Sequence, residues 1–118
     1  MSIEHLKGLD LHDCPVHSID FDFTEMTIKI KVDIFNESKD DYDFLELYFY
    51  GVSRISMDMS ELNPIDIEIS SYEVSETENN RHIQFILLEG PGQPDIKLSF
   101  EFDRATKTFI DVDVKAKE

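Results

Sequence analysis

The chain has 118 residues, 41% of them hydrophobic, and a formal net charge of −15 from 11 basic and 26 acidic side chains. This length predicts a single domain over residues 1–118, with one core that needs no disulfide or metal. The acidic residues are divided evenly between the two halves, so the folded surface rather than a tail carries the charge. Such a surface repels nucleic-acid phosphates and anionic membranes and attracts basic protein partners, although it also serves solubility alone.

The single cysteine excludes an intrachain disulfide and gives no indication of an oxidising compartment. The first ten residues, MSIEHLKGLD, lack the basic and apolar regions of a signal peptide. No apolar run approaches the roughly 20 residues that a membrane-spanning helix needs. We therefore expect a cytoplasmic protein without membrane contact.

Apolar and polar residues alternate along the first third of the chain, which predicts strands over residues 16–23 and 26–35. The short Thr24–Glu25 link joins them into a hairpin, in which Asp20 or Asp22 lies opposite Lys29 or Lys31. The residues expected on the inner face are His17, Ile19, Phe21 and Phe23 in the first strand, and Met26, Ile28, Ile30, Val32 and Ile34 in the second.

Residues 36–43, NESKDDYD, are predicted to form a polar loop before a strand over residues 44–50. That strand places Leu45, Leu47 and Phe49 on one face, and it ends at Gly51-Val52. A short strand over residues 54–59 follows, with Ile55, Met57 and Met59 inward. Residues 60–63, SELN, are compatible with one helical turn, because Ser60 can cap it and Pro64 limits it.

The second half is predicted to be a meander of strands over residues 65–70, 81–89, 96–102 and 109–114. Ile65, Ile67 and Ile69 share one face, whereas Tyr72 and Val74 have the opposite parity, so a bulge is expected near Ser70–Ser71. Turns are expected at residues 78–80, 90–95 and 103–107. The fold class is therefore all-β, with about eight antiparallel strands in a sandwich or partly closed barrel and at most one short helical turn.

Reactive side chains are densest in residues 11–18, LHDCPVHS, which contain His12, Asp13, Cys14 and His17. Cysteine and histidine are zinc ligands, but a structural zinc site needs four ligands and the chain has no second cysteine. A nucleophilic Cys14 would need a thiolate, which acidic surroundings suppress, and no glycine-rich loop offers an oxyanion hole. Two interpretations remain. The first is a metal or small-ligand site that uses these four residues, or a three-ligand site of His12, Cys14 and His82. The second is a turn that leads through Pro15 into the first strand.

Aspartates and tyrosines cluster in residues 40–50, and acidic groups beside aromatic rings favour protein binding. The residues that we expect to bind a partner are Asp40, Asp41, Tyr42, Asp43, Tyr48 and Tyr50. The alternative is that the tyrosines lie on a strand buried on both faces. The loop over residues 36–43 has no glycine and does not match a calcium-binding loop, and we expect no metal or cofactor.

The order of LHDCPVHSIDFD, MTIKIKVDIF, LELYFYGVSRISMD and LNPIDIEIS resembles the immunity protein 50 family of small bacterial domains found beside polymorphic toxins. The resemblance covers residues 10–70. It implies a non-enzymatic cytoplasmic protein that binds and blocks a toxin, and a toxin would then be the basic partner. A small-ligand or metal-binding β domain and a purely structural domain are the competing hypotheses, and the oligomeric state does not follow from the sequence.

Overall fold

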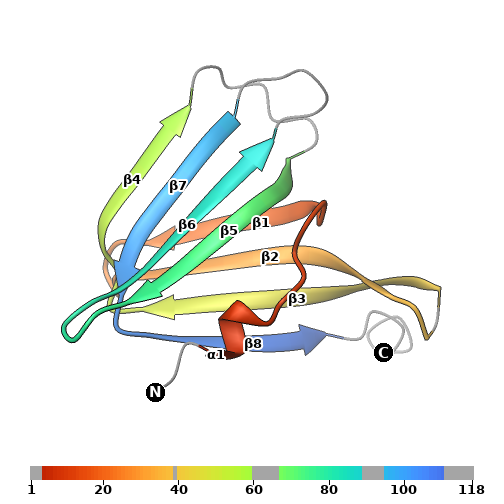
Figure 1. Cartoon of the computed structure of the whole chain (residues 1–118), viewed down its shortest axis with the longest axis horizontal. Helices are drawn as coiled ribbons and strands as arrows, with labels where there is room; N and C mark the ends of the chain where they lie inside the picture. The colour runs from red at the N-terminus through yellow and green to blue at the C-terminus, as the bar shows by residue number, and fades with distance from the viewer. Residues whose placement is uncertain (1–3, 39, 60–66, 89–94, 111–118) are drawn as a thin grey trace.

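The computed structural model describes residues 4–38, 40–59, 67–88 and 95–110, which form two four-stranded antiparallel sheets (Figure 1). The strands are β1 (Val16–Asp22), β2 (Thr27–Asn36), β3 (Asp41–Tyr50), β4 (Ser53–Met59), β5 (Glu68–Glu76), β6 (Arg81–Leu88), β7 (Asp95–Phe102) and β8 (Arg104–Ile110). One sheet has the order β1-β2-β3-β8 and the other β4-β7-β6-β5. The predicted all-β fold class is confirmed, as a sandwich whose sheets do not close into a barrel.

One short helical turn, α1 (Glu4–Lys7), precedes β1. The turn that the sequence predicts at residues 60–63 lies outside the described residues, as do the connection at residues 89–94 and the strand end after residue 110. Tyr72 of β5 holds α1 and the segment after it against the second sheet. Its hydroxyl oxygen lies 2.5 Å from the carbonyl oxygen of Leu6 in α1 and 2.6 Å from the carbonyl oxygen of Leu9.

The core follows directly from the alternation of the sequence, because paired strands place their apolar residues on the same inner face. Phe49 of β3 is fully buried and contacts rings of the opposite sheet, with its centroid 4.9 Å from Phe100 and 5.1 Å from Phe102. Predicted inner residues that are buried include Ile28, Ile30, Val32, Leu45, Leu47 and Ile69, and β6 adds the buried Ile83, Phe85 and Leu87.

Two corners carry the chain from one sheet to the other, at Gly51–Val52 between β3 and β4 and at Asp103 between β7 and β8. The corners are in contact, since the Asp103 amide donates to the carbonyl of Tyr50 at 2.8 Å. Gly51 has a φ of +63°, and a Cβ atom there would collide with the carboxylate of Asp103. This close approach in a left-handed conformation is why the corner needs glycine.

The second corner corrects one prediction, because residues 103–107 are not a turn. Only Asp103 links the two strands, and β8 begins at Arg104. The sequence DRATK contains few apolar residues. Ala105 is nevertheless buried opposite Phe49, so it shows which residues of β8 face the core. A small inner side chain leaves no hydrophobic signal for the strand.

The expected bulge in β5 is confirmed, because the pairing register with β6 shifts between Ile69 and Ser71. The first hairpin is also confirmed, and Asp20 pairs with Lys29. Its turn differs in detail: Phe23 is 72% exposed and Met26 is 41% exposed with a φ of +54°, so neither faces the core as predicted. Both residues lie in the turn between β1 and β2, outside the two paired strands.

β4 is an edge strand, and this position explains why its inner side chains are not buried. Met57 pairs with Leu98, so it has the predicted facing, yet it is 40% exposed, and Ile55 is 36% exposed. A register shift between Ser53 and Ser56 coincides with a φ of +52° at Arg54. Irregularities of this kind are common at sheet edges.

Candidate functional site

The stretch over residues 11–18 connects the two sheets through backbone hydrogen bonds. The amide of Asp13 donates to the carbonyl of Ile69 at 2.8 Å. In return, the amide of Ile69 donates to the carbonyl of Cys14 at 2.9 Å. On the other side, the amide of Asp33 in β2 donates to the carbonyl of Pro15 at 2.9 Å. Asp13 itself is in the left-handed region, with a φ of +63°. The geometry is therefore that of a turn that ties β5 to β2.

The side chains of this stretch point into different environments. Nδ1 of His12 lies 2.7 Å from the carbonyl oxygen of Ser70, and its Nε2 lies 3.3 Å from the carboxylate of Asp13. The carbonyl contact, and then the negative charge of Asp13, raise the pKa of His12 above 6.5. Cys14 is buried, and its Sγ atom lies 3.8 Å from the carbonyl oxygen of Asp10. Burial is the main cause that raises the pKa of the Cys14 thiol, and the carboxylate of Asp10 adds to it.

His17 lies on the outer face of the first sheet, which corrects the prediction that it continues the inner apolar face. It occupies a bulge in β1, between Val16 and Ser18, and the additional residue reverses its facing. Its ring centroid is 5.1 Å from that of Phe44, and its Nδ1 is 3.9 Å from Asp33. His12, Cys14 and His17 thus do not converge, and among the described residues no three His, Cys, Asp or Glu side chains are grouped to hold a metal ion.

The six residues that the sequence indicates for partner binding are all on or next to β3, but the structure places them at its two ends. Tyr48 and Tyr50 stack with centroids 4.6 Å apart, and the guanidinium of Arg104 lies 3.9 Å from the Tyr50 ring centre. Tyr48 pairs with Lys29 of β2. Tyr48 lies seven positions along the extended strand from Asp41, roughly 23 Å at the usual rise. The two tyrosines therefore belong to a surface of mixed charge rather than to the acidic end.

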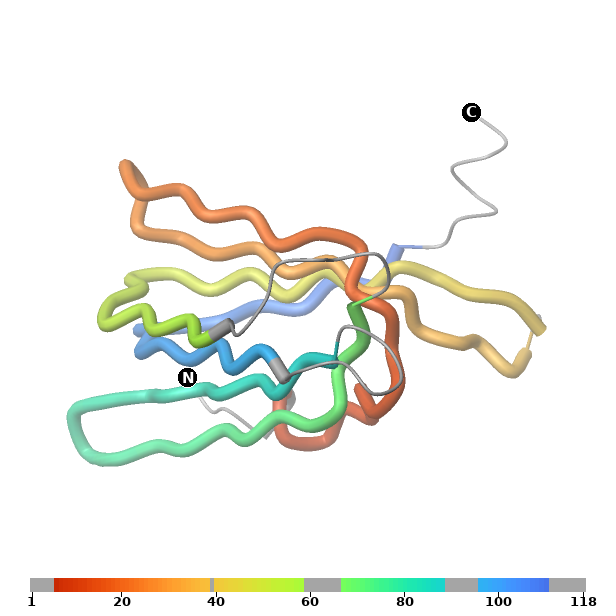
Figure 2. Tube along the Cα trace, turned by 90° about the horizontal axis from the view of Figure 1, so that it is seen from above, coloured from red at the N-terminus to blue at the C-terminus, as the bar shows by residue number. Residues whose placement is uncertain are grey.

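The other four residues lie where the β2–β3 hairpin extends beyond the described parts of both neighbouring strands. The pairing of β1 with β2 ends at Val32, and the pairing of β8 with β3 runs from Phe44, which lies opposite Ile110, the last described residue of β8. Within the described residues, positions 34–36 and 41–43 thus pair only with each other. We call this part of the hairpin, residues 34–43, the finger. Figure 2 shows it projecting at the right of the molecule.

The finger carries aromatic side chains on its outer face. Phe35 is 47% exposed and Tyr42 is 50% exposed, and the two rings meet edge to face with centroids 5.4 Å apart. Phe109 of β8, on the inner face beside the base of the finger, is 57% exposed. Neither Phe35 nor Phe109 is among the partner-binding residues that the sequence indicates. Because Phe35 alternates with the inward Ile34, the sequence could have indicated that Phe35 faces outward. The facing of Phe109 could be inferred only with the correct start of β8.

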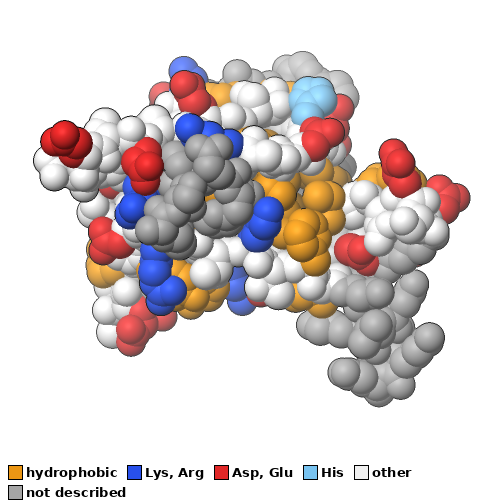
Figure 3. Space-filling model, turned by 60° about the horizontal axis from the view of Figure 1, so that its bottom comes forward, with side chains coloured by type: hydrophobic (Ala, Val, Ile, Leu, Met, Phe, Trp, Pro, Cys, Tyr) orange, Lys and Arg blue, Asp and Glu red, His pale blue; other side chains and the backbone are white. Residues whose placement is uncertain are grey.

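The end of the finger is acidic and has a defined turn. Glu37, Asp40 and Asp41 are exposed. The side-chain oxygen of Asn36 accepts the amide of Ser38 at 3.0 Å, and Asp40 has a φ of +52°. In Figure 3 the finger is the lobe at the right, and the charged side chains coloured on it are those of Asp and Glu. The predicted polar loop of residues 36–43 is therefore shorter than expected, since β2 ends at Asn36 and β3 begins at Asp41.

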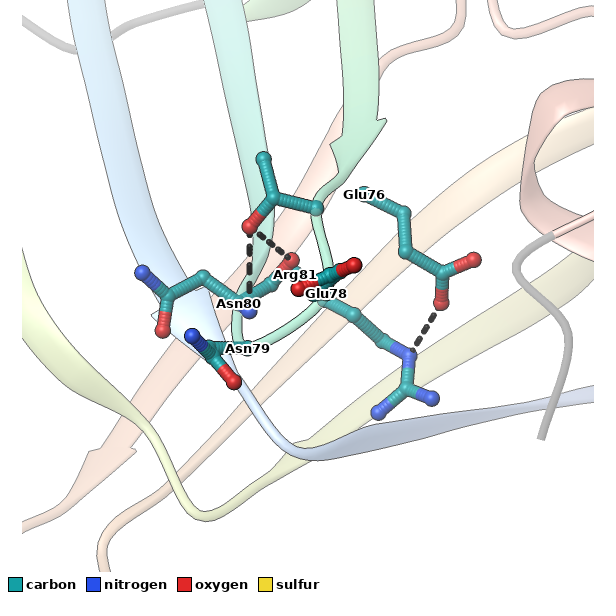
Figure 4. A pocket seen from close by; sticks show the side chains of 6 residues that line it. Glu76, Glu78, Asn79, Asn80 and Arg81 are labelled. Carbon is teal, nitrogen blue, oxygen red and sulfur yellow. Dashed lines mark hydrogen bonds and ion pairs between the residues drawn. The ribbon is translucent and has the colours of Figure 1, made fainter.

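A hollow lies at the turn between β5 and β6, lined by residues 76–81 (Figure 4). Its polar groups bond to one another: Nε of Arg81 donates to Glu76 at 2.7 Å, and the hydroxyl oxygen of Thr77 accepts the amide of Asn80 at 3.2 Å. Arg81 also donates to the carbonyl of Asp103. The shape of this hollow therefore results from the hydrogen bonds and the ion pair of the turn itself.

None of the family models compared with the chain matches it, and no curated protein or solved structure is significantly similar to it. Among the described residues, no helix has the length and apolar character to cross a membrane.

Proposed function

We propose that this chain is a non-enzymatic protein-interaction domain whose finger docks onto a basic partner protein. The observation that carries the proposal is the combination, on one projecting two-stranded segment, of half-exposed aromatic rings and an acidic end. A two-stranded hairpin is marginally stable in water when nothing packs against it. Large aromatic side chains that are half exposed on such a segment gain further burial against a second molecule.

The charge of the whole chain supports the same partner class. A net charge of −15 produces a negative potential around the molecule, which accelerates the approach of a basic protein and opposes that of nucleic acid. The aromatic pair of Phe35 and Tyr42 would then provide the apolar contact that holds the complex. The charge thus acts during the encounter of the two proteins, and the aromatic contact acts once they have docked.

The finer proposal is that the partner is a toxin. It rests on the resemblance of residues 10–70 to immunity protein 50 domains, together with the charge just described. Its first test is the genomic neighbourhood of the coding sequence, where we expect an adjacent reading frame for a large protein with a basic C-terminal domain. Neighbouring genes without such a product would contradict the toxin, but not the interaction domain.

The docking surface is tested by site-specific photo-crosslinking in cells of the source organism. A photoreactive phenylalanine analogue at Tyr42 is expected to capture a protein of basic isoelectric point. The matched control places the analogue at Phe23, an even more exposed aromatic residue in the β1–β2 turn. Capture of the same protein from position 23 with equal yield, or of no basic protein from position 42, would contradict the proposal.

A further inference from the structure

The segment that precedes β1 contributes to the hydrophobic core. We call residues 6–14 the strap, and Figure 1 shows it in red between α1 and β1. Leu6, Leu11 and Cys14 of the strap are buried and belong to the same core cluster as the inner residues of the two sheets. Release of the strap would therefore expose apolar side chains to water, and what holds it in place matters for the whole fold.

β5 holds the strap near both of its ends. Near the start, the hydroxyl group of Tyr72 contacts two carbonyl groups of the strap. Near the end, the backbone of Ile69 exchanges hydrogen bonds with Asp13 and Cys14, at 2.8 and 2.9 Å. These bonds do not change near neutral pH, because they involve backbone groups and a tyrosine whose pKa is raised above its ordinary value of 10.0.

His12 adds a contact of a different kind between the strap and β5. Its Nδ1 atom lies 2.7 Å from the carbonyl oxygen of Ser70, and its Nε2 atom lies 3.3 Å from the carboxylate of Asp13. Ser70 is the additional residue of the bulge in β5, and the pairing register with β6 passes over it. His12 thus bonds to a backbone group that the sheet itself leaves unpaired.

Both partners of the His12 ring can only accept a hydrogen bond. A carbonyl oxygen and an ionised carboxylate have no proton to donate. A neutral imidazole has one N–H group and can satisfy only one of the two contacts, whereas an imidazolium has two and satisfies both. The geometry therefore matches the protonated ring, with one N–H directed at β5 and the other at the strap.

The charged groups around His12 favour the protonated ring as well. Asp13 and Asp10 of the strap act on it through their negative charges. On β5, the charged residues before and after the bulge are Glu68 and Glu73, which are also acidic. The carbonyl contact first, and then the charges of Asp13 and Asp10, raise the pKa of His12 above 6.5.

We propose that protonated His12 is a pH-sensitive switch that fastens the strap to β5. Release of the strap returns the histidine to its ordinary pKa of about 6.5, so the contact stabilises the closed strap fully below that pH. This contribution is lost as pH rises through the raised pKa of His12 in the closed form. The backbone bonds and the Tyr72 contact remain, so the strap opens more often at higher pH while the fold persists.

The test is hydrogen exchange of the backbone amides of Asp13 and Ile69, which become accessible when the strap opens. Protection factors, which correct for the intrinsic pH dependence of exchange, are compared at about pH 5.5 and about pH 8. We expect both to fall at least about threefold at the higher pH. The amides of Val52 and Asp103, which donate to carbonyls at the two corners, are the internal control. An equal fall at all four amides, or no fall at Asp13 and Ile69, would overturn the proposal.

Two variants show whether His12 is the titrating group. In His12→Gln the side-chain amide can still donate to the Ser70 carbonyl but does not titrate, so the protection factors are expected to be equal at the two pH values. The His12 side chain is 68% exposed, so this variant is expected to fold. His82→Gln is the matched control, because it removes a histidine of β6 outside the strap. Retention of the pH dependence in His12→Gln, or its loss in His82→Gln, would overturn the proposal.

Discussion

Phe49 is the residue on which the packing of the two sheets most depends. Besides its contacts with Phe100 and Phe102, its ring meets that of Phe85 with centroids 6.5 Å apart. Phe49→Ala is expected to lower the free energy of unfolding by about 3–5 kcal/mol, through lost burial and a cavity. Urea denaturation measures the change, and Phe23→Ala, at a 72% exposed position, should change stability by less than about 0.5 kcal/mol. Similar losses in the two variants would contradict the core described here.

Cys14 was one of the reactive candidates, and its environment predicts an inert thiol. Burial and the nearby carboxylate of Asp10 both raise its pKa, so little thiolate exists near neutral pH. In native protein at pH 8, iodoacetamide is expected to alkylate Cys14 more than about tenfold more slowly than in urea-unfolded protein. Equal rates in the two states would show that the thiol is accessible and activated.

His12 provides a test of the turn that ties the sheets together. Its imidazole is expected to titrate by NMR with a pKa above 6.5, chiefly because the Ser70 carbonyl accepts from Nδ1. Asp13→Asn should lower the pKa only in part, since the charge of Asp13 is the second cause, and asparagine tolerates the left-handed backbone. A folded-state pKa above the unfolded value stabilises the fold below about pH 6.5, and that stabilisation is lost as pH rises through the raised pKa. A pKa at or below 6.5 would contradict the contact.

At the scale of elements, the two corners that exchange strands between the sheets depend on each other. Gly51→Ala is expected to cost about 1–3 kcal/mol, from the left-handed backbone and the contact with Asp103. The same substitution in an Asp103→Ala background should cost less, because the carboxylate that the new Cβ meets is gone. Thermal or urea denaturation of the four proteins in this cycle checks the coupling, and equal costs in the two backgrounds would contradict it.

Alternation in the sequence predicted most strands because each has large apolar residues at every second position. Even the bulge near Ser70 followed from a change of parity between Ile69 and Tyr72. The bulge at His17 could not be predicted in this way, because histidine is compatible with either face and does not reveal the shift. The start of β8 was missed for a similar reason, since Ala105 is the only apolar residue among its first five.

At the scale of the whole molecule, the candidate site was only partly predictable. The acidic tip was evident from the composition of residues 40–43, but its separation from Tyr48 and Tyr50 depends on where β3 begins. The facing of Phe109 depends on the pairing between β3 and β8, which are far apart in sequence. Long-range register and the lengths of neighbouring strands determine which residues project, and neither is encoded in local patterns.

We propose that the acidic end of the finger steers a basic partner to the molecule. The most direct measurement is the association rate, at low and at moderate salt, between this chain and the protein captured at Tyr42. Asp40→Lys/Asp41→Lys is expected to slow association about tenfold at low salt and to flatten its salt dependence. Glu25→Lys/Glu73→Lys changes the net charge equally at exposed sites outside the finger, and it should have a smaller effect. Equal association rates in the two double variants would contradict steering by the finger, because the net charge alone would then determine the rate.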